Sequence, residues 1–262
     1  MTMNNDISAA SARYPSLAGK SVFVTGGGSG IGADIVAAFA RQGARVAFAD
    51  RDVAAAQAFL AALAEEGVAV PLFIACDLAD IASLRAAVLA ATQAHGEVDV
   101  LINNVANDAR HDWLAVSPEQ FDAGVTINLK VAYFAAQAVA PGMLRRGGGV
   151  IVNLGSIGWQ GKVDRYAVYA TCKSAVNGLT RSLARELGGS RVRVNTLTPG
   201  WVMTPRQLAQ WVDAAAERAI DENQCLPGRV VGQDIANLAL FLAADDSRMI
   251  TGQEFVVDAG WI

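Results

Sequence analysis

Short apolar runs alternate with long alanine-rich segments along most of this 262-residue chain. The runs at 22–24 and 100–102 are apolar without alternation, as expected for strands that are covered on both faces. Strands separated by helices form βαβ units, and such units build a parallel sheet. The expected strands are 21–25, 45–49, 69–75, 99–102, 149–153, 193–198 and 254–257.

The segments between these strands predict helices. Ser117-Pro118 is typical of a capped helix start, and Gly188-Gly189 of a helix stop. The irregular stretch at 199–227 precedes the last unit, where a lid over a substrate would lie. The expected helices are 30–42, 53–66, 81–95, 118–145, 167–187 and 233–243, with a further one at 206–220.

Composition excludes several classes of protein. A net charge of -4 argues against a nucleic-acid or anionic membrane partner. The three cysteines, Cys76, Cys172 and Cys225, have no metal-like spacing and favour a reducing cytoplasm. Residues 1–16 lack the apolar core of a secretion signal, and no apolar run approaches the roughly 18 residues of a membrane span. We therefore expect a cytoplasmic protein without a metal site.

The glycine-rich sequence TGGGSGIG at 25–32 joins the first expected strand to the first expected helix. Glycines there let the backbone approach a pyrophosphate, which the helix N-terminus stabilises. The motif alone is weak, but Asp50 at the end of the second strand strengthens it. A carboxylate there accepts hydrogen bonds from the ribose hydroxyls and repels a 2′-phosphate, so NAD is expected. The guanidinium of Arg51 could accommodate a 2′-phosphate, which would allow NADP, or Arg51 could simply face solvent at the start of a helix.

Tyr169 and Lys173 lie four residues apart in an expected helix, so their side chains share one face. A nearby cation lowers the pKa of a phenol, and moving that pKa from near 10 toward neutrality takes on the order of 4 kcal/mol. Lys173 and a positively charged nicotinamide ring could supply this together. Taken alone the pair is an ordinary helix turn, but the glycine loop, Asn128 and Ser156 precede it in order and indicate a dehydrogenase site.

Together these motifs resemble the short-chain dehydrogenase/reductase family over residues 18–262. Residues 103–106 match the family's NNAG element, with Val105-Ala106 in place of Ala-Gly, and Pro199-Gly200 matches its PG element. The resemblance implies an α/β single-domain Rossmann fold, a seven-stranded parallel sheet with helices on both faces. The dinucleotide-binding and catalytic domain would cover 17–262, with a flexible tail at 1–16 and a substrate lid at about 200–227. Family members commonly form homotetramers or homodimers.

The same resemblance implies the roles of the site residues. Tyr169 is the general base in oxidation, Ser156 orients the alcohol, and Lys173 holds the nicotinamide ribose and is linked through Asn128 to a water-borne proton path. Tyr166 lacks a lysine four residues later, so it is assigned to packing or the pocket wall. The expected cofactor contacts are Gly26, Ser29, Gly30, Ile31, Asp50, Arg51, Asp77, Leu78, Asn104, Val105, Tyr169, Lys173, Pro199, Gly200, Val202 and Thr204.

The segments expected around the substrate are polar and rich in indoles. A sugar site needs amides, carboxylates and aromatic faces, whereas a steroid or fatty-acyl site is mostly aliphatic. The pattern resembles the bacterial NAD-dependent aldose 1-dehydrogenases of the family, which oxidise xylose, arabinose, galactose or fucose to the lactone. The expected substrate contacts are Asn107, Asp108, Arg110, His111, Ser156, Trp159, Gln160, Tyr169, Trp201 and Gln207.

Several of these residues have another interpretation. Asn107 and Asp108 can make loop turns, Arg110 can pair with Asp112 at the surface, and Asp77 is as well placed to cap a turn as to contact adenine. His111 is more often a structural residue than a ligand, and Trp201 and Trp211 are equally typical of a core or subunit contact.

We therefore expect hydride transfer from the anomeric carbon of an aldose to NAD, giving an aldonolactone. The alternatives are an NAD(P)-dependent enzyme for another small hydroxy or keto compound, such as a polyol or a 3-oxoacyl thioester, and a regulator that has lost catalysis.

Overall fold

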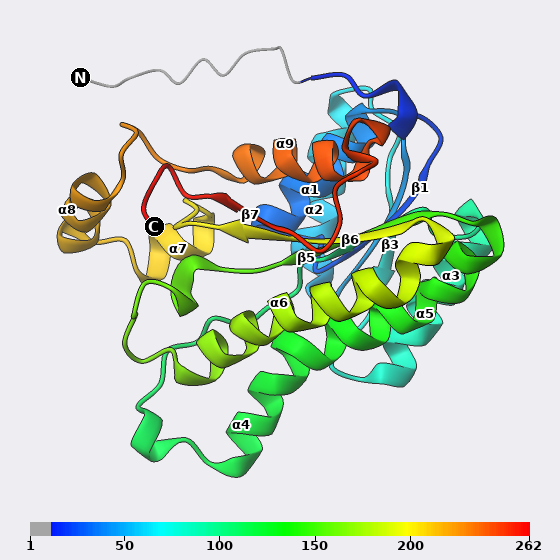
Figure 1. Cartoon of the computed structure of the whole chain (residues 1–262). Coiled ribbons are helices and arrows are strands. Elements are labelled where there is room, and N and C mark those ends of the chain that lie inside the picture. The colour runs from blue at the N-terminus through cyan, green and yellow to red at the C-terminus, as the bar shows by residue number, and fades with distance from the viewer. Residues whose placement is uncertain (1–11) are drawn as a thin grey trace.

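All seven strands of the sheet run parallel, in the order β3-β2-β1-β4-β5-β6-β7 (Figure 1). The computed structural model describes residues 12–262. The strand order reverses between β1 and β4, which pair directly from Val22 with Val100 to Thr25 with Asn103. The strands are β1 Ser21–Thr25, β2 Arg45–Asp50, β3 Leu72–Ala75, β4 Val100–Asn103, β5 Gly149–Leu154, β6 Val192–Pro199 and β7 Glu254–Val257.

Helices cover both faces of this sheet, so the fold is the predicted α/β Rossmann fold. On one face α1, α2 and α9 bury an apolar core, and on the other α3, α5 and α6 bury a second one (Figure 1). Strands that lie between two such cores are apolar on both faces, which explains their unbroken apolar runs. These helices are α1 Gly30–Arg41, α2 Val53–Glu65, α3 Ile81–His95, α5 Val131–Arg146, α6 Ala167–Leu187 and α9 Gly232–Ala243.

The helix expected at 118–145 is not continuous. It consists of α4 Pro118–Val125, a π-helical turn Thr126–Lys130 and α5. The turn contains Asn128, whose side-chain amide donates to the Gly124 carbonyl oxygen at 3.0 Å. Such wide turns have no signature in the apolar pattern, because they add one residue without breaking the helix direction.

The helix expected at 206–220 is two helices, α7 Pro205–Gln210 and α8 Ala214–Asn223. Thr204 caps α7, and the carboxylate of Asp213 accepts hydrogen bonds from the first turn of α8. An aspartate inside the predicted helix therefore begins a new helix instead, because its short side chain binds free backbone N–H groups. Both helices lie at the end of the molecule where the sheet's carboxyl edge opens (Figure 1).

Two further boundaries differ in detail from the expectation. The third strand begins at Leu72 rather than at 69. Of the expected tail at 1–16, residues 1–11 lie outside the described residues, and Tyr14 already bonds through its backbone N–H to Gln42. Between residues 12 and 262, no helix has both the length and the apolar character needed to cross a membrane.

Candidate active site

A cavity of about 1090 Å³ opens at the carboxyl ends of the strands. Its walls come from the segments that follow β1, β2, β3, β4, β5 and β6, together with α6 and α7. Open α/β sheets bind ligands at this edge, next to the point where the strand order reverses. The fold thus brings to one cleft residues that are far apart in the sequence, such as Gly26 and Trp261, which are 235 positions apart.

The glycine-rich loop fits a dinucleotide because α1 packs tightly against the end of β1. A Cβ atom on Gly32 would lie 1.9 Å from the carbonyl oxygen of Gly26, so only glycine allows this approach. Gly26 has a φ of 70°, a left-handed conformation that glycine adopts without strain. Asn104 fixes the same loop, since its amide donates to the Thr25 and Gly26 carbonyl oxygens at 3.1 and 2.7 Å. The α1 N-terminus therefore faces the cleft with its backbone N–H groups.

Asp50 lies at the end of β2 with its carboxylate fixed beside this loop. One carboxylate oxygen accepts from the backbone N–H of Gly28 at 2.9 Å, and the other from that of Asp52 at 3.1 Å. The carboxylate also lines the cleft, as does the exposed Arg51. A fixed anion at this position can accept hydrogen bonds from two ribose hydroxyls and opposes a phosphate there.

A buried polar chain joins α6 to the sheet. The Asn103 amide donates to Asn153 at 2.9 Å, the Asn153 amide donates to Thr180 at 2.9 Å, and the Thr180 and Thr196 hydroxyls lie 2.8 Å apart. Buried polar groups stabilise a structure only in the arrangement that pairs them. This chain therefore sets the position of α6, the helix that carries Tyr169 and Lys173.

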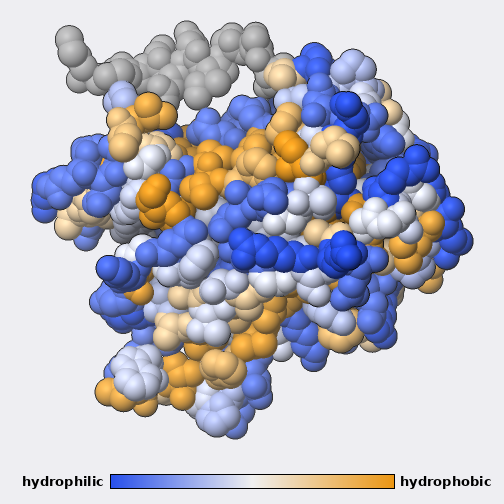
Figure 2. All heavy atoms as spheres, viewed as in Figure 1, coloured by the Kyte–Doolittle hydropathy of each residue, from blue (hydrophilic) through white to orange (hydrophobic). Residues whose placement is uncertain are grey.

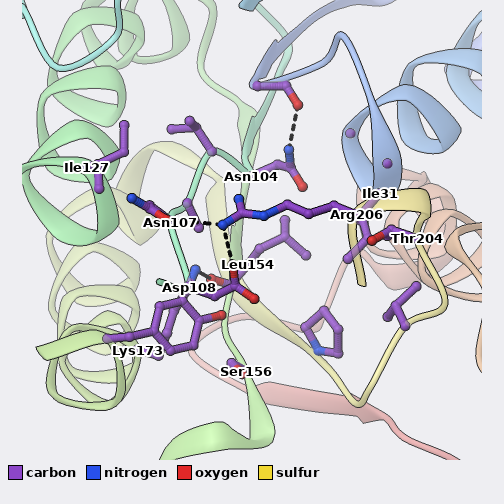
Figure 3. A pocket seen from close by; sticks show the side chains of 18 of the residues that line it. Ile31, Asn104, Asn107, Asp108, Ile127, Leu154, Ser156, Lys173, Thr204 and Arg206 are labelled. Atoms are coloured by element: carbon purple, nitrogen blue, oxygen red, sulfur yellow. Dashed lines mark hydrogen bonds and ion pairs between the residues drawn. The ribbon is translucent and has the colours of Figure 1, made fainter. Parts of the chain in front are cut away.

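Tyr169, Lys173 and Ser156 line the same cleft, as the spacing predicts. Figure 3 shows Lys173 and Ser156 there. The ammonium of Lys173 lies 5.6 Å from the centre of the Tyr169 ring and donates to the Leu154 carbonyl oxygen at 2.7 Å. The Ser156 hydroxyl accepts from the backbone N–H of Gly158 at 3.1 Å. Because a hydroxyl has one proton and two lone pairs, Ser156 can still donate toward the cleft.

The protein's own groups do not lower the pKa of the Tyr169 phenol. Burial raises that pKa above 10, and the opposing effects of a hydrogen bond with Ser156 and of the Arg206 charge are smaller. Burial likewise lowers the pKa of Lys173 to about 8. The expected lowering of the phenol's pKa, by Lys173 together with a positively charged nicotinamide ring, is not produced by the protein's residues alone. Burial removes the solvation that stabilises the charged forms of both Tyr169 and Lys173.

Asn128 lies behind the catalytic face rather than on the main cleft. The residue is 4 % exposed, and its side-chain amide exchanges two hydrogen bonds with the backbone of Asn107, at 2.8 and 3.0 Å. The π-helical turn thus holds the segment that follows β4. Asn128, Tyr169 and His111 also line a second cavity of about 300 Å³.

Most of the expected contact residues line the main cleft, but Asn128, His111, Trp159 and Gln160 do not. The His111 ring lies 3.4 Å from the backbone nitrogen of Val168, which agrees with its structural interpretation. Trp159 ends a 3-10 turn that follows Ser156, and Gln160 comes directly after it. Within residues 12–262, the indole nitrogen of Trp159 and the side-chain oxygen of Gln160 are buried and have no hydrogen-bond partner. All the expected cofactor contacts line the cleft.

Two of the open alternatives are resolved by contacts. The carboxylate of Asp77 accepts from the backbone N–H of Ala79 at 3.0 Å, so Asp77 caps a turn while it also lines the cleft. The interpretation that Arg110 pairs with Asp112 at the surface was wrong. The Arg110 guanidinium stacks over the Trp211 ring at 4.3 Å, because the lid brings an aromatic face to it.

The sequence did not predict two residues of the cleft wall, Arg206 and Trp261, and it left Tyr166 to packing or the pocket wall. Arg206 on α7 reaches across the cleft to Asn107 and Asp108 (Figure 3). Tyr166 lines the cleft, and its hydroxyl lies 3.4 Å from Asp108. Trp261 packs against Trp201 with ring centres 6.3 Å apart. Only Tyr166 had a sequence signal, its position three residues before Tyr169; the other two depend on how the lid and the C-terminus fold back.

Comparison with known proteins places the chain among oxidoreductases. A family model described as enoyl-(acyl carrier protein) reductase matches residues 26–262. The chain is 46% identical to a D-xylose 1-dehydrogenase of Caulobacter vibrioides over 251 residues, which cover 96% of this chain and 99% of that protein. It is 42% identical to a probable galactose dehydrogenase, GalD, of Rhizobium meliloti, with 95% and 98% coverage.

A solved structure shares the fold closely. It is a 7α-hydroxysteroid dehydrogenase complexed with NADH and 7-oxo glycochenodeoxycholic acid, with a TM-score of 0.89 and 30% sequence identity. The match covers 94% of this chain and 96% of that one. From the sheet order, the glycine cradle, the Tyr169–Lys173 pair and these similarities, the chain is a member of the short-chain dehydrogenase/reductase family of oxidoreductases.

Proposed function

We propose that the protein is an NAD-dependent aldose 1-dehydrogenase, which oxidises the anomeric carbon of a sugar to an aldonolactone. The observation that carries this proposal is a group of hydrogen-bonded polar side chains in the cleft that holds Tyr169: Asp108, Gln207 and Trp201. Carboxylate, amide and indole groups are the partners that a polyhydroxylated ring requires. The similarity to two sugar dehydrogenases supports the same substrate class.

The preference for NAD follows from Asp50. Its carboxylate is held by two backbone N–H groups and cannot turn away from a ribose that enters the cleft. A 2′-phosphate would meet this fixed negative charge, while two free hydroxyls would find an acceptor. When bound, the nicotinamide ring of NAD supplies the hydride acceptor and a positive charge.

Tyr169 is the base in this proposal. Its phenolate takes the proton of the C1 hydroxyl while the hydride leaves C1, so that the carbon becomes the carbonyl of the lactone. Ser156 donates its free proton to the same sugar oxygen and holds it near the phenol. The Lys173 ammonium, fixed by the Leu154 carbonyl, stabilises the phenolate that burial alone disfavours.

A substrate panel tests the proposal. The purified protein is incubated with NAD and, separately, with aldopentoses, aldohexoses, polyols, a hydroxysteroid and a 3-hydroxyacyl thioester, and NADH formation is followed by absorbance. We expect turnover with one or more aldoses and a lactone product, which mass spectrometry identifies. Activity only with the steroid, polyol or thioester would contradict the proposal. Repeating the active reaction with NADP tests the cofactor, for which we expect a much lower kcat/KM.

A further inference from the structure

Asp108 has an unusual environment for a residue in a substrate cleft. Its side chain is 17% exposed, and three different donors converge on its carboxylate. Oδ2 accepts from the Gln207 amide at 2.7 Å and from the Tyr166 hydroxyl at 3.4 Å, while Oδ1 lies 3.1 Å from the Arg206 guanidinium. Figure 3 shows Arg206 reaching this carboxylate from the opposite wall of the cleft.

The three donors do not saturate the carboxylate. Two carboxylate oxygens offer about four lone-pair sites, so at least one acceptor site remains. The Arg206 side chain is 47% exposed, and an exposed ion pair contributes little stability, so its site can be exchanged for another donor. Asp108 can therefore accept hydrogen bonds from a ligand without losing Gln207 or Tyr166.

The orientation of the carboxylate is set by two other side chains of the cleft, Gln207 and Trp201. The indole N–H of Trp201 donates to the Gln207 side-chain oxygen at 3.0 Å, which leaves the Gln207 amide nitrogen to point at Asp108. This chain links the start of the lid, α7 and the segment after β4. An acceptor that is fixed before the ligand arrives discriminates between ligands better than a mobile one.

The position of Asp108 relative to Tyr169 fits a substrate hydroxyl. The rings of Tyr166 and Tyr169 pack edge to face with centres 5.1 Å apart, and the Tyr166 hydroxyl touches Asp108. The carboxylate is thus separated from the proposed base by one aromatic ring. A sugar whose C1 hydroxyl meets Tyr169 would present a ring hydroxyl toward Asp108.

We propose that Asp108 selects the substrate by accepting a hydrogen bond from one ring hydroxyl of the sugar, with Gln207 as the residue that positions it. This inference rests on the proposed aldose dehydrogenase activity. A hydrogen bond from a hydroxyl to a carboxylate is charge-assisted and about twice as strong as a neutral one. A site built around such a bond rejects analogues that lack the hydroxyl, because one acceptor site of the half-buried carboxylate then has no partner from the ligand.

The experiment compares Asp108→Asn with the wild type on the best aldose and on its deoxy analogues, each lacking one ring hydroxyl. The wild type should lose about 10- to 100-fold in kcat/KM with one particular deoxy analogue. For Asp108→Asn we expect a similar loss with the parent aldose and little further loss with that analogue. NAD affinity and the unfolding midpoint report on the cofactor site and the fold, and both should stay near wild type.

The matched control is Asp112→Asn, which removes the same charge from the same segment. Asp112 is exposed and accepts a hydrogen bond from the backbone of Leu114, outside the cleft. This variant should keep the wild-type discrimination against every deoxy analogue. A role of Asp108 in net charge alone would make the two variants behave alike and would overturn the inference.

Gln207→Leu gives an independent test of the positioning role. It removes the amide that orients Asp108 and leaves the carboxylate in place. We expect a higher KM for the sugar and weaker discrimination against the same deoxy analogue, with NAD affinity unchanged. Equal losses with the parent sugar and all deoxy analogues would mean that Asp108 and Gln207 only hold the lid, and would overturn the inference.

These outcomes separate the inference from the proposed function. If the wild type oxidises aldoses and Asp108→Asn keeps full deoxy discrimination, the assignment of Asp108 fails while the activity stands. If the wild type oxidises no aldose, the proposed function fails and the assignment fails with it.

Discussion

At the scale of one residue, the buried charge of Lys173 lowers the stability of the folded protein. The side chain is 3% exposed, and burial lowers the pKa of its ammonium from 10.5 to about 8. Below about pH 8 both the folded and the unfolded chain hold this proton, and the folded state bears the full cost of burying the charge. Between pH 8 and 10.5 the folded protein loses the proton first, so this group makes stability rise with pH.

Replacing Lys173 with methionine removes this dependence. Between about pH 8 and 10, the wild type should gain roughly 1.4 kcal/mol of unfolding free energy per pH unit relative to Lys173→Met. Urea unfolding at several pH values measures the difference, and turnover should be lost at all of them. Parallel stability curves for the two proteins would show that the ammonium is not buried as the structure has it.

For Tyr169 and Ser156, the sequence predicted the position in the cleft but not the direction in which the pKa of Tyr169 is shifted. Their positions in the sequence predicted that both side chains lie at the cleft. Helical periodicity fixes which side chains share a helix face, and the ends of parallel strands lie at one edge of the sheet. The direction of the Tyr169 pKa depends instead on how much of the phenol is desolvated. Desolvation comes from the packing of distant segments and leaves no local pattern in the sequence.

At the scale of elements, α1 depends on its close contact with the end of β1. A methyl group on Gly32 would overlap the Gly26 carbonyl oxygen, so Gly32→Ala must push the helix away from the loop. We expect NAD affinity to fall by at least about tenfold, together with a loss of roughly 1–3 kcal/mol in unfolding free energy. Calorimetric titration with NAD and urea unfolding measure the two effects.

Gly188→Ala is the matched control for this substitution. The added methyl group would have no atom within 4 Å, and Gly188 has a φ of -60° that alanine adopts readily. This variant should bind NAD as the wild type does and be no less stable. If Gly32→Ala also bound NAD normally, the tight approach of α1 to the loop would not be needed for the cofactor.

The irregular elements were the ones that the sequence did not predict. The expected helix 118–145 followed a helical apolar pattern throughout, and its π-helical turn depends on a hydrogen bond between Asn128 and the distant Asn107 backbone. The expected helix 206–220 is divided before Asp213, a residue type that often caps a helix start. The prediction followed the apolar periodicity of the segment instead of this capping residue. The seven strands were predicted to within a few residues, because burial on both faces dictates their composition.

At the scale of the molecule, exposed apolar side chains within residues 113–133 indicate a further contact. Trp113, Leu114, Phe121 and Tyr133 are 70%, 77%, 45% and 48% exposed. Figure 2 shows apolar residues on the projection that this segment forms below the body of the molecule. Exposed apolar surface of this kind marks interaction sites. We propose that a second copy of the chain covers it in a homodimer or homotetramer.

Light scattering coupled to size exclusion tests this association. The wild type should elute with the mass of two or four chains, and the double substitution Trp113→Gln and Leu114→Gln should shift it toward the monomer. The exposed positions make these changes harmless to the fold of one chain, which circular dichroism checks. A wild-type monomer at every concentration would contradict the proposal.

The central claim is that Tyr169 takes the proton of the sugar while the rest of the cleft binds NAD without it. The most direct measurement compares wild type and Tyr169→Phe in aldose turnover and in NAD binding by calorimetry. The account predicts a fall in kcat of about 10²- to 10⁴-fold while NAD still binds. Substantial residual turnover by Tyr169→Phe, with NAD bound normally, would contradict it and show that another group is the base.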